Sequence, residues 1–171
     1  MAPIIQTRNA DAQLLGSPDH LWAKDRNFAF EAYAASSESF TGETVLGIGN
    51  QRQNFSPEIY DFSSNILTIF QPGVYLFSYH SSFTMSGGVA GQVAVYLQQD
   101  PATGTFTTVL GTIQYVYLPA NLNASMQCVI PLLVGINYRY RIAAIRTSGS
   151  GNVSTISQTT ELSAILLFNN S

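Results

Sequence analysis

One stretch constrains the fold of this 171-residue chain more than any other, the alternating run from Gln71 to Phe83. Pro72 and Gly73 end the preceding element, because proline fixes φ and glycine permits a turn. The residues that follow alternate with a period of two, which is the period of a β-strand. Both faces begin apolar, so we expect this strand to be covered on both sides, within a sandwich or against another subunit. One face would hold Tyr75, Phe77, Tyr79, Ser81 and Phe83, and the other Val74, Leu76, Ser78 and His80.

The rest of the body predicts further short strands, separated by turns rich in Gly, Pro and Asn. This spacing is typical of an all-β sandwich or barrel, and no internal repeat or second core is visible. Met126–Val134 and Tyr138–Ile145 are expected to pair with each other across the turn Gly135-Ile136-Asn137. The other expected strands are Phe28–Tyr33, Thr44–Ile48, Ile66–Phe70, Gln92–Gln98, Thr107–Leu118 and Thr160–Phe168.

Three consecutive motifs resemble the signature of the globular head of complement C1q. They are Tyr60–Ser64 (YDFSS), Leu67–Phe70 (LTIF) and Pro72–His80 (PGVYLFSYH), and the ending Leu162–Phe168 is similar to the closing motif of that family. The resemblance extends from Phe28 to Asn169. It implies a jelly roll of the tumour-necrosis-factor (TNF) type, with about ten strands, assembled as a tight homotrimer.

This chain also departs from the resembled family in two respects. Members usually carry a collagen stalk of Gly-x-y repeats before the head, and this chain has none. Some members bind calcium through loop aspartates, and the family often has Gly-Asp where this chain has Gly135-Ile136-Asn137. The second departure puts calcium binding in doubt, and we expect no cofactor and no metal.

Residues 1–26 form a segment of different character, which we interpret as an N-terminal arm preceding a jelly-roll domain at residues 27–171. Asn9–Gly16 fits one or two helical turns, with Asn as the N-cap and a closing Gly. The alternative is a frayed terminus. The arm's apolar side chains favour docking onto another surface; they are Ile4, Ile5, Leu14, Leu15, Leu21 and Trp22.

The chain is poor in charge, since charged residues make up 10% of it against about a quarter in typical domains. Only five of its charges lie after Asp61. A net charge of -3 provides no basic field for nucleic acid or anionic lipid. No apolar run approaches the roughly 20 residues of a membrane span, and no signal-peptide pattern opens the chain. These features predict a protein made in a cytoplasm that binds neither nucleic acid nor membrane.

Apolar residues on both faces of several strands, together with this low charge, predict a contact between subunits. The alternative is a monomer with scattered apolar surface residues. One face of the strand after Gly73 and part of the closing strand are expected to face the neighbouring subunit. The residues predicted to lie at a trimer interface are Leu76, Ser78, His80, Leu166 and Phe168.

No catalytic constellation is visible. His20 and His80 are sixty positions apart and lack partners at metal-ligand spacing. His80 is interpreted as a strand residue rather than a general base, and Cys128 as a buried small hydrophobe rather than a nucleophile. Glu38 and Glu43 are interpreted as solvated acids rather than a glycosidase pair. The chain is therefore not expected to be an enzyme.

Two functions remain open. The first is a structural protein of a phage or virus, a trimeric capsid decoration (cement) or fibre-head protein that attaches through the N-terminal arm to a capsid or other scaffold. This protein would be found in the virion after synthesis in the host cytoplasm. The second is a secreted, extracellular C1q-like module that recognises carbohydrate or protein through its loops. Without an export signal or a stalk, the sequence favours the first.

Overall fold

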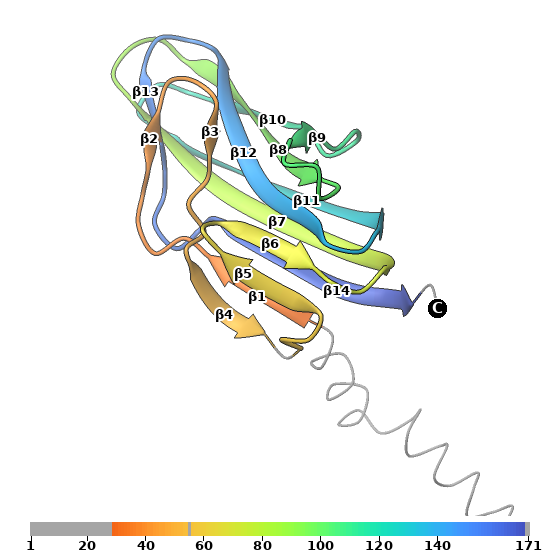
Figure 1. The fold of residues 1–171 in the computed structure, drawn as a ribbon. Helices are drawn as coiled ribbons and strands as arrows, with labels where there is room; N and C mark the ends of the chain where they lie inside the picture. Colours follow the sequence, from red (N-terminus) through yellow and green to blue (C-terminus); the bar gives the residue numbers. More distant parts are fainter. Residues whose placement is uncertain (1–28, 55, 170–171) are drawn as a thin grey trace, which may run out of the picture.

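The computed structural model describes residues 29–54 and 56–169, which form two antiparallel sheets packed face to face (Figure 1). The prediction of an all-β sandwich is confirmed. The described part has fourteen strands, three of which have only two residues, against the ten or so expected. It contains no helix, and hence none that could cross a membrane. The N-terminal arm lies outside the described residues.

Sheet A is organised around β7, the strand predicted from the alternating run. Strand β11 pairs along one edge of β7, while β14 and β13 pair with successive parts of its other edge. Strand β1 pairs with β14 on one side and with β4 on the other. The strands of sheet A are β1 (Ala29–Tyr33), β2 (Ser39–Phe40), β4 (Asn50–Asn54), β7 (Gly73–Ser86), β11 (Asn123–Val134), β13 (Asn152–Thr155) and β14 (Glu161–Asn169).

Sheet B is organised around β12, which pairs with β8 along one edge and with β6 and β3 along the other. Strand β10 forms the far edge beside β8, and β5 forms the opposite edge beside β6. The strands of sheet B are β3 (Thr44–Val45), β5 (Tyr60–Ser63), β6 (Ile66–Ile69), β8 (Gly91–Asp100), β9 (Thr107–Thr108), β10 (Gln114–Leu118) and β12 (Tyr138–Ser148).

The core lies between the two sheets and is rich in aromatic rings. The alternation predicted for β7 is confirmed, because Tyr75, Phe77 and Tyr79 are buried whereas Leu76 and His80 on the other face are half-buried. The Phe77 ring packs on the Tyr140 ring of β12 with centroids 4.5 Å apart, which joins sheet A to sheet B. Aromatic side chains bury large apolar areas, so this layer supplies much of the stabilisation of the fold.

One pairing prediction is wrong: β11 and β12 do not pair with each other. Strand β11 pairs with β7 over its whole length, and β12 pairs with β8, so the turn at residues 135–137 crosses from sheet A to sheet B. Asn137 adopts a positive φ of 60°, and a Cβ on Gly135 would lie 2.5 Å from the Tyr138 ring. The positive φ and the close approach of the Tyr138 ring explain why Asn and Gly occupy this turn. The same residues suit a crossing between sheets and a hairpin equally, so they did not distinguish the two.

Candidate functional site

The outward residues of three adjacent strands form the candidate site, which we call the assembly face. Strand β7 lies between β11 and β14, and residues in register across an antiparallel sheet point to the same side. Four rows of residues therefore cross this face, apolar at one end and polar at the other. From the apolar end they are Leu133, Val74 and Phe168; Pro131, Leu76 and Ile165; Val129, Ser78 and Ser163; and Gln127, His80 and Glu161.

The apolar end of the assembly face is open to solvent in a single chain. Val129 is 54% exposed, Leu133 67% and Phe168 68%, and Leu76 between them is half-buried. Single exposed apolar residues are ordinary, but side chains gathered on neighbouring strands mark an interaction surface. Strand β11 forms an edge of sheet A, and Pro131 lacks the N–H that edge-to-edge strand pairing would need. This geometry favours packing onto the face rather than extension of the sheet.

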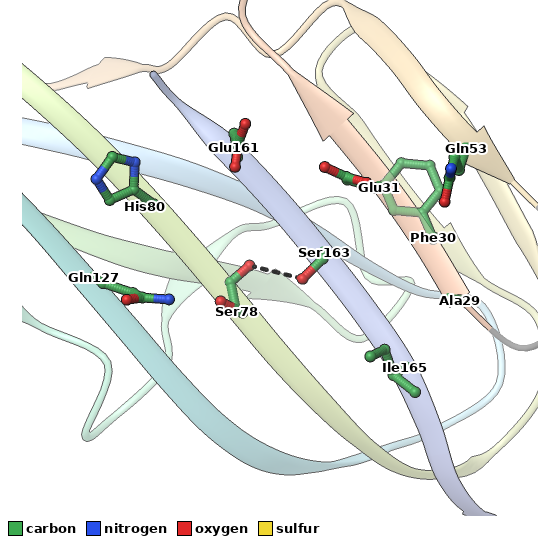
Figure 2. A pocket seen from close by; sticks show the side chains of 10 residues that line it. All are labelled: Ala29, Phe30, Glu31, Gln53, Ser78, His80, Gln127, Glu161, Ser163 and Ile165. Atoms are coloured by element: carbon green, nitrogen blue, oxygen red, sulfur yellow. Dashed lines mark hydrogen bonds between the residues drawn. The ribbon is translucent and has the colours of Figure 1, made fainter. Parts of the chain in front are cut away.

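The polar end of the face is hollowed into a groove of about 290 Å³ (Figure 2). Figure 2 shows His80 of β7 between Gln127 of β11 and Glu161 of β14. The Ser163 hydroxyl donates a hydrogen bond to the Ser78 carbonyl oxygen at 3.5 Å on the groove floor. The complete lining is Ala29, Phe30, Glu31, Gln53, Ser78, His80, Gln127, Glu161, Ser163 and Ile165.

A backbone hydrogen bond fixes the imidazole of His80. Its Nδ1 lies 2.7 Å from the carbonyl oxygen of Thr159, which precedes β14. Because a carbonyl oxygen only accepts, Nδ1 must carry the hydrogen, and any second proton must bind at Nε2. His80 is thus the strand residue that the sequence predicted, held by a partner that the sequence did not indicate.

Three charged side chains meet beside the groove. Arg52 on β4 forms ion pairs with Glu31 of β1 and with Glu161 of β14, the latter at 3.1 Å. The Coulombic attraction of Glu31 is the largest effect on the pKa of Arg52, and with Glu161 it raises that pKa. Two carboxylates share one guanidinium, so the set has one negative charge in excess when His80 is neutral. Exposed pairs of this kind add little to the stability of a single chain.

The structure brings four of the five predicted interface residues onto one face, namely Leu76, Ser78, His80 and Phe168. That this face contacts another subunit stays a prediction. Leu166 is in register with the buried Tyr75 and packs against the core, so its predicted outward placement is wrong. The cause is a β-bulge between Leu166 and Phe168. In a regular strand these two residues would point to the same side of the sheet, and the bulge makes them point to opposite sides.

The sequence missed the contribution of β11 to the assembly face. The sequence indicated apolar residues on both faces of several strands, but it predicted that Met126–Val134 pairs with Tyr138–Ile145, which is part of β12. Pairing with β7 instead places Val129, Pro131 and Leu133 beside Ser78, Leu76 and Val74. The arm residues predicted to dock, Ile4, Ile5, Leu14, Leu15, Leu21 and Trp22, lie outside the described residues.

A second exposed patch lies on β10, at the edge of sheet B. Tyr115 and Tyr117 point outward together and are largely exposed, with Ile113 just before the strand. Beside Tyr117 lies its register partner Gln92, whose side-chain oxygen accepts a hydrogen bond from the Thr147 hydroxyl at 3.1 Å. This patch, the tyrosine patch, presents aromatic and polar uncharged groups.

The described residues hold no group of three His, Cys, Asp or Glu side chains able to bind a metal ion. Cys128 is buried in the core, as predicted. Glu38 and Glu43, expected to be solvated, have separate partners: Glu38 accepts a hydrogen bond from the Gly47 N–H at 2.8 Å and Glu43 one from the Gln98 amide at 2.8 Å. The two acids bind different parts of the chain.

The comparison with solved structures decides the fold type. Eiger TNF from S. frugiperda superimposes with a TM-score of 0.63 at 11% identity, covering 84% of this chain and 94% of that one. The globular domain of zebrafish complement 1qA gives 0.59 at 11% identity, covering 84% and 99%. The fold is the jelly roll of the TNF and C1q type.

Murine APRIL shares this TNF/C1q-like jelly roll, with a TM-score of 0.56 at 11% identity over 82% of this chain and 98% of that one. No protein-family profile matches the chain, and no curated protein does. The likeness at this level of identity is one of fold, and it confirms the resemblance inferred from the motifs between Tyr60 and His80.

Proposed function

We propose that this protein is a non-enzymatic structural knob that assembles as a homotrimer through its assembly face. The N-terminal arm then attaches the trimer to a larger scaffold, namely a phage or virus capsid, where the knob serves as a decoration or fibre-head protein of the virion. The observation that supports assembly most strongly is the apolar end of the assembly face. Each apolar side chain of that size contributes roughly 1.5–3 kcal/mol when fully buried.

The scarcity of charge supports the same proposal. Subunit interfaces exclude charged residues from their centres, because an unpaired buried ion is costly. The apolar rows from Leu133 to Ile165 contain no charged side chain, and the ions nearby are confined to the polar end, where Arg52 pairs both carboxylates. A cyclic trimer joins two different surfaces of each copy, so the assembly face would meet another part of the neighbouring chain.

The place where the arm joins the fold supports its role as an attachment. Strand β1 begins at Ala29, which is in register with Ile165 in the apolar part of the assembly face. The described part of the chain therefore begins at the assembly face. Ordering about twenty residues costs of order 1–2 kcal/mol per residue, which is comparable with the burial of the arm's six large apolar side chains. The arm would then be ordered mainly by a partner.

Two matched charge substitutions test the assembly. Leu133→Glu places a carboxylate on the assembly face, whereas Leu110→Glu places one on an exposed residue outside it. Both side chains are exposed in a single chain, so both variants should fold. Leu110→Glu should melt near the wild-type trimer, and Leu133→Glu near a dissociated wild-type chain, because assembly stabilises the folded state. Sedimentation should show a trimer for Leu110→Glu and a monomer for Leu133→Glu. If the Leu133→Glu protein stays trimeric, the assembly face does not form the subunit interface.

Deletion of residues 1–26 tests the attachment. We expect the truncated chain to remain folded and trimeric but to bind no scaffold, as judged by its occupancy on purified host particles. Normal decoration by the truncated chain would contradict the proposed role of the arm. Failure of the truncated chain to fold would show that the arm belongs to the core.

The tyrosine patch favours a second candidate, a C1q-like module that binds carbohydrate or protein. Tyrosine presents a rigid ring and a hydroxyl at low entropic cost, and it is enriched in recognition surfaces. The double variant Tyr115→Ser/Tyr117→Ser should leave the trimer intact if this patch binds an external ligand. Screening wild type and variant against immobilised glycans and candidate proteins separates the two functions. A ligand that binds the wild type but not the double variant would favour the second function, a C1q-like binding module.

A further inference from the structure

The polar end of the assembly face contains a histidine close to three charged side chains. Histidine is the side-chain type whose charge ordinarily changes between about pH 5 and 8. His80 lines a groove on the surface proposed to contact another copy. Its Nδ1 is held by the Thr159 carbonyl oxygen, so proton uptake at Nε2 leaves that hydrogen bond in place. A change of charge can therefore occur in the groove without rearrangement of the ring.

The charges around His80 come from three strands. On β14, Glu161 is the register partner of His80, which places the two Cβ atoms about 4.5–5.5 Å apart. On β1, Glu31 lines the same groove, and on β4 Arg52 pairs with both carboxylates. On β11 the facing residue is the uncharged Gln127. With neutral His80 the set has a net charge of one negative unit; with protonated His80 the positive and negative charges are equal.

Covering this groove by a second copy removes water from the charged groups. An unbalanced charge then costs more than a balanced set, because the interaction with solvent is lost. The assembled state should therefore favour the protonated imidazole, and repulsion between equally charged grooves on several copies would add to this preference.

We propose that His80 makes assembly of this chain dependent on pH, with tighter association in mildly acidic solution than in mildly alkaline solution. The inference rests on the proposed homotrimer. The sign follows from linkage: a group that prefers its protonated form in the assembled state strengthens assembly at low pH and ceases to do so as pH rises. Each copy that takes up one proton changes the association constant by up to tenfold per pH unit.

Sedimentation equilibrium of the full chain tests the proposal from about pH 8 to about pH 5.5, a range in which glutamates stay largely ionised. The concentration for half-dissociation of wild type should fall at least about tenfold over this range. His80→Gln retains a donor for the Thr159 carbonyl oxygen and should abolish the change. His20 is present in every variant and so cancels from the comparison.

Glu161→Gln provides the sharper control. Without this carboxylate, Glu31 and Arg52 balance each other, so protonation of His80 now creates an excess positive charge. The pH dependence should reverse, with weaker association in acid. A wild-type trimer whose association does not change with pH would overturn the inference while leaving the proposed trimer standing, as would a Glu161→Gln protein with the wild-type sign. A wild type that is monomeric at every pH would overturn both.

Discussion

The outward face of the central strands of sheet B, β8 and β12, is covered by the chain itself, whereas the outward face of sheet A leaves apolar side chains open. On sheet B, Ala94, Tyr96 and Ala143 form a small second cluster, in which Tyr96 is only 7% exposed and Ala143 is fully buried. On sheet A, the equivalent outward positions include Val129 and Leu133, more than half exposed. Two faces of one sandwich thus reach different degrees of burial in a single chain.

Polar partners complete the cover of sheet B. Arg141 donates to the Gln98 side chain at 2.7 Å, and Gln98 in turn donates to Glu43 at 2.8 Å. The guanidinium of Arg141 lies 4.0 Å from the centroid of the Phe106 ring. Burial, followed by the hydrogen bond and charge of Glu43, raises the pKa of Tyr96 to about 12. The central strands of sheet B are therefore covered without a second copy, and the contrast supports the proposal that the open face of sheet A takes part in assembly.

The largest effect should come from a charge placed on the covered face. Ala143→Asp would bury a carboxylate at a position with no exposed surface, and we expect a loss of about 3–5 kcal/mol in the free energy of unfolding. Val129→Asp on sheet A should leave the single chain folded and weaken only its association. Urea denaturation of each variant, followed by sedimentation, measures both quantities. Equal losses of folding stability for the two variants would break the contrast between the faces.

Truncation of the covering aromatic residue should have a somewhat smaller effect. Tyr96→Ala removes a ring that packs beside Ala94 and Ala143, and the cost should be about 3 kcal/mol in unfolding free energy. Trimer formation should be unchanged at temperatures where the variant is folded. Denaturation monitored by tyrosine fluorescence gives the loss, and light scattering gives the mass. Dissociation of a folded Tyr96→Ala chain would indicate that sheet B also takes part in assembly.

The smallest effect should be a loss of folding stability in acid that depends on Asp100, the last residue of β8. Asp100 is fully buried and pairs with Arg139, and it accepts hydrogen bonds from the Thr103 and Gly104 N–H groups. Burial acts to raise the pKa of Asp100, but the hydrogen bonds from Arg139 and Thr103 outweigh it and lower the pKa below 3.8. A lowered pKa contributes stability above the unfolded value, and this contribution is lost as the pH falls below it.

Thermal melting from neutral pH to about pH 3 should therefore show a fall in wild-type stability at the acid end that Asp100→Asn shares only in part. The variant should be less stable than wild type at neutral pH and closer to it in acid. A constant difference between the two across this range would mean that Asp100 acts through its shape and hydrogen bonds rather than its charge.

The sequence predicted well what depends on local periodicity. Alternation placed Tyr75, Phe77 and Tyr79 in the core, and the motifs around them indicated the jelly roll later found by structural comparison. It failed where pairing depends on distant strands: the turn ending at Asn137 is compatible with a hairpin and with a crossing between sheets. The bulge beyond Leu166 likewise has no signal in the sequence, because it arises from the fit of β14 to β7.

The assembly face itself could be predicted only in part. Leu76, Ser78 and His80 follow from the alternation of one strand, and Phe168 lies on the same face, in register with Val74. The groove, however, combines residues of β1, β4, β7, β11 and β14, whose register is set by the whole sheet. Residue types along the chain do not reveal that Arg52 lies between Glu31 and Glu161, since these positions meet only after three strands have paired.

Sedimentation equilibrium of the wild-type chain at micromolar concentration tests the central claim most directly. A trimer has a mass of about 56 kDa, three times the 18.6 kDa of one chain. We expect this mass near neutral pH, because the apolar end of the assembly face contains no titratable side chain. A mass of 18.6 kDa under the same conditions would show that the open face of sheet A is stable without a second copy and would contradict the account.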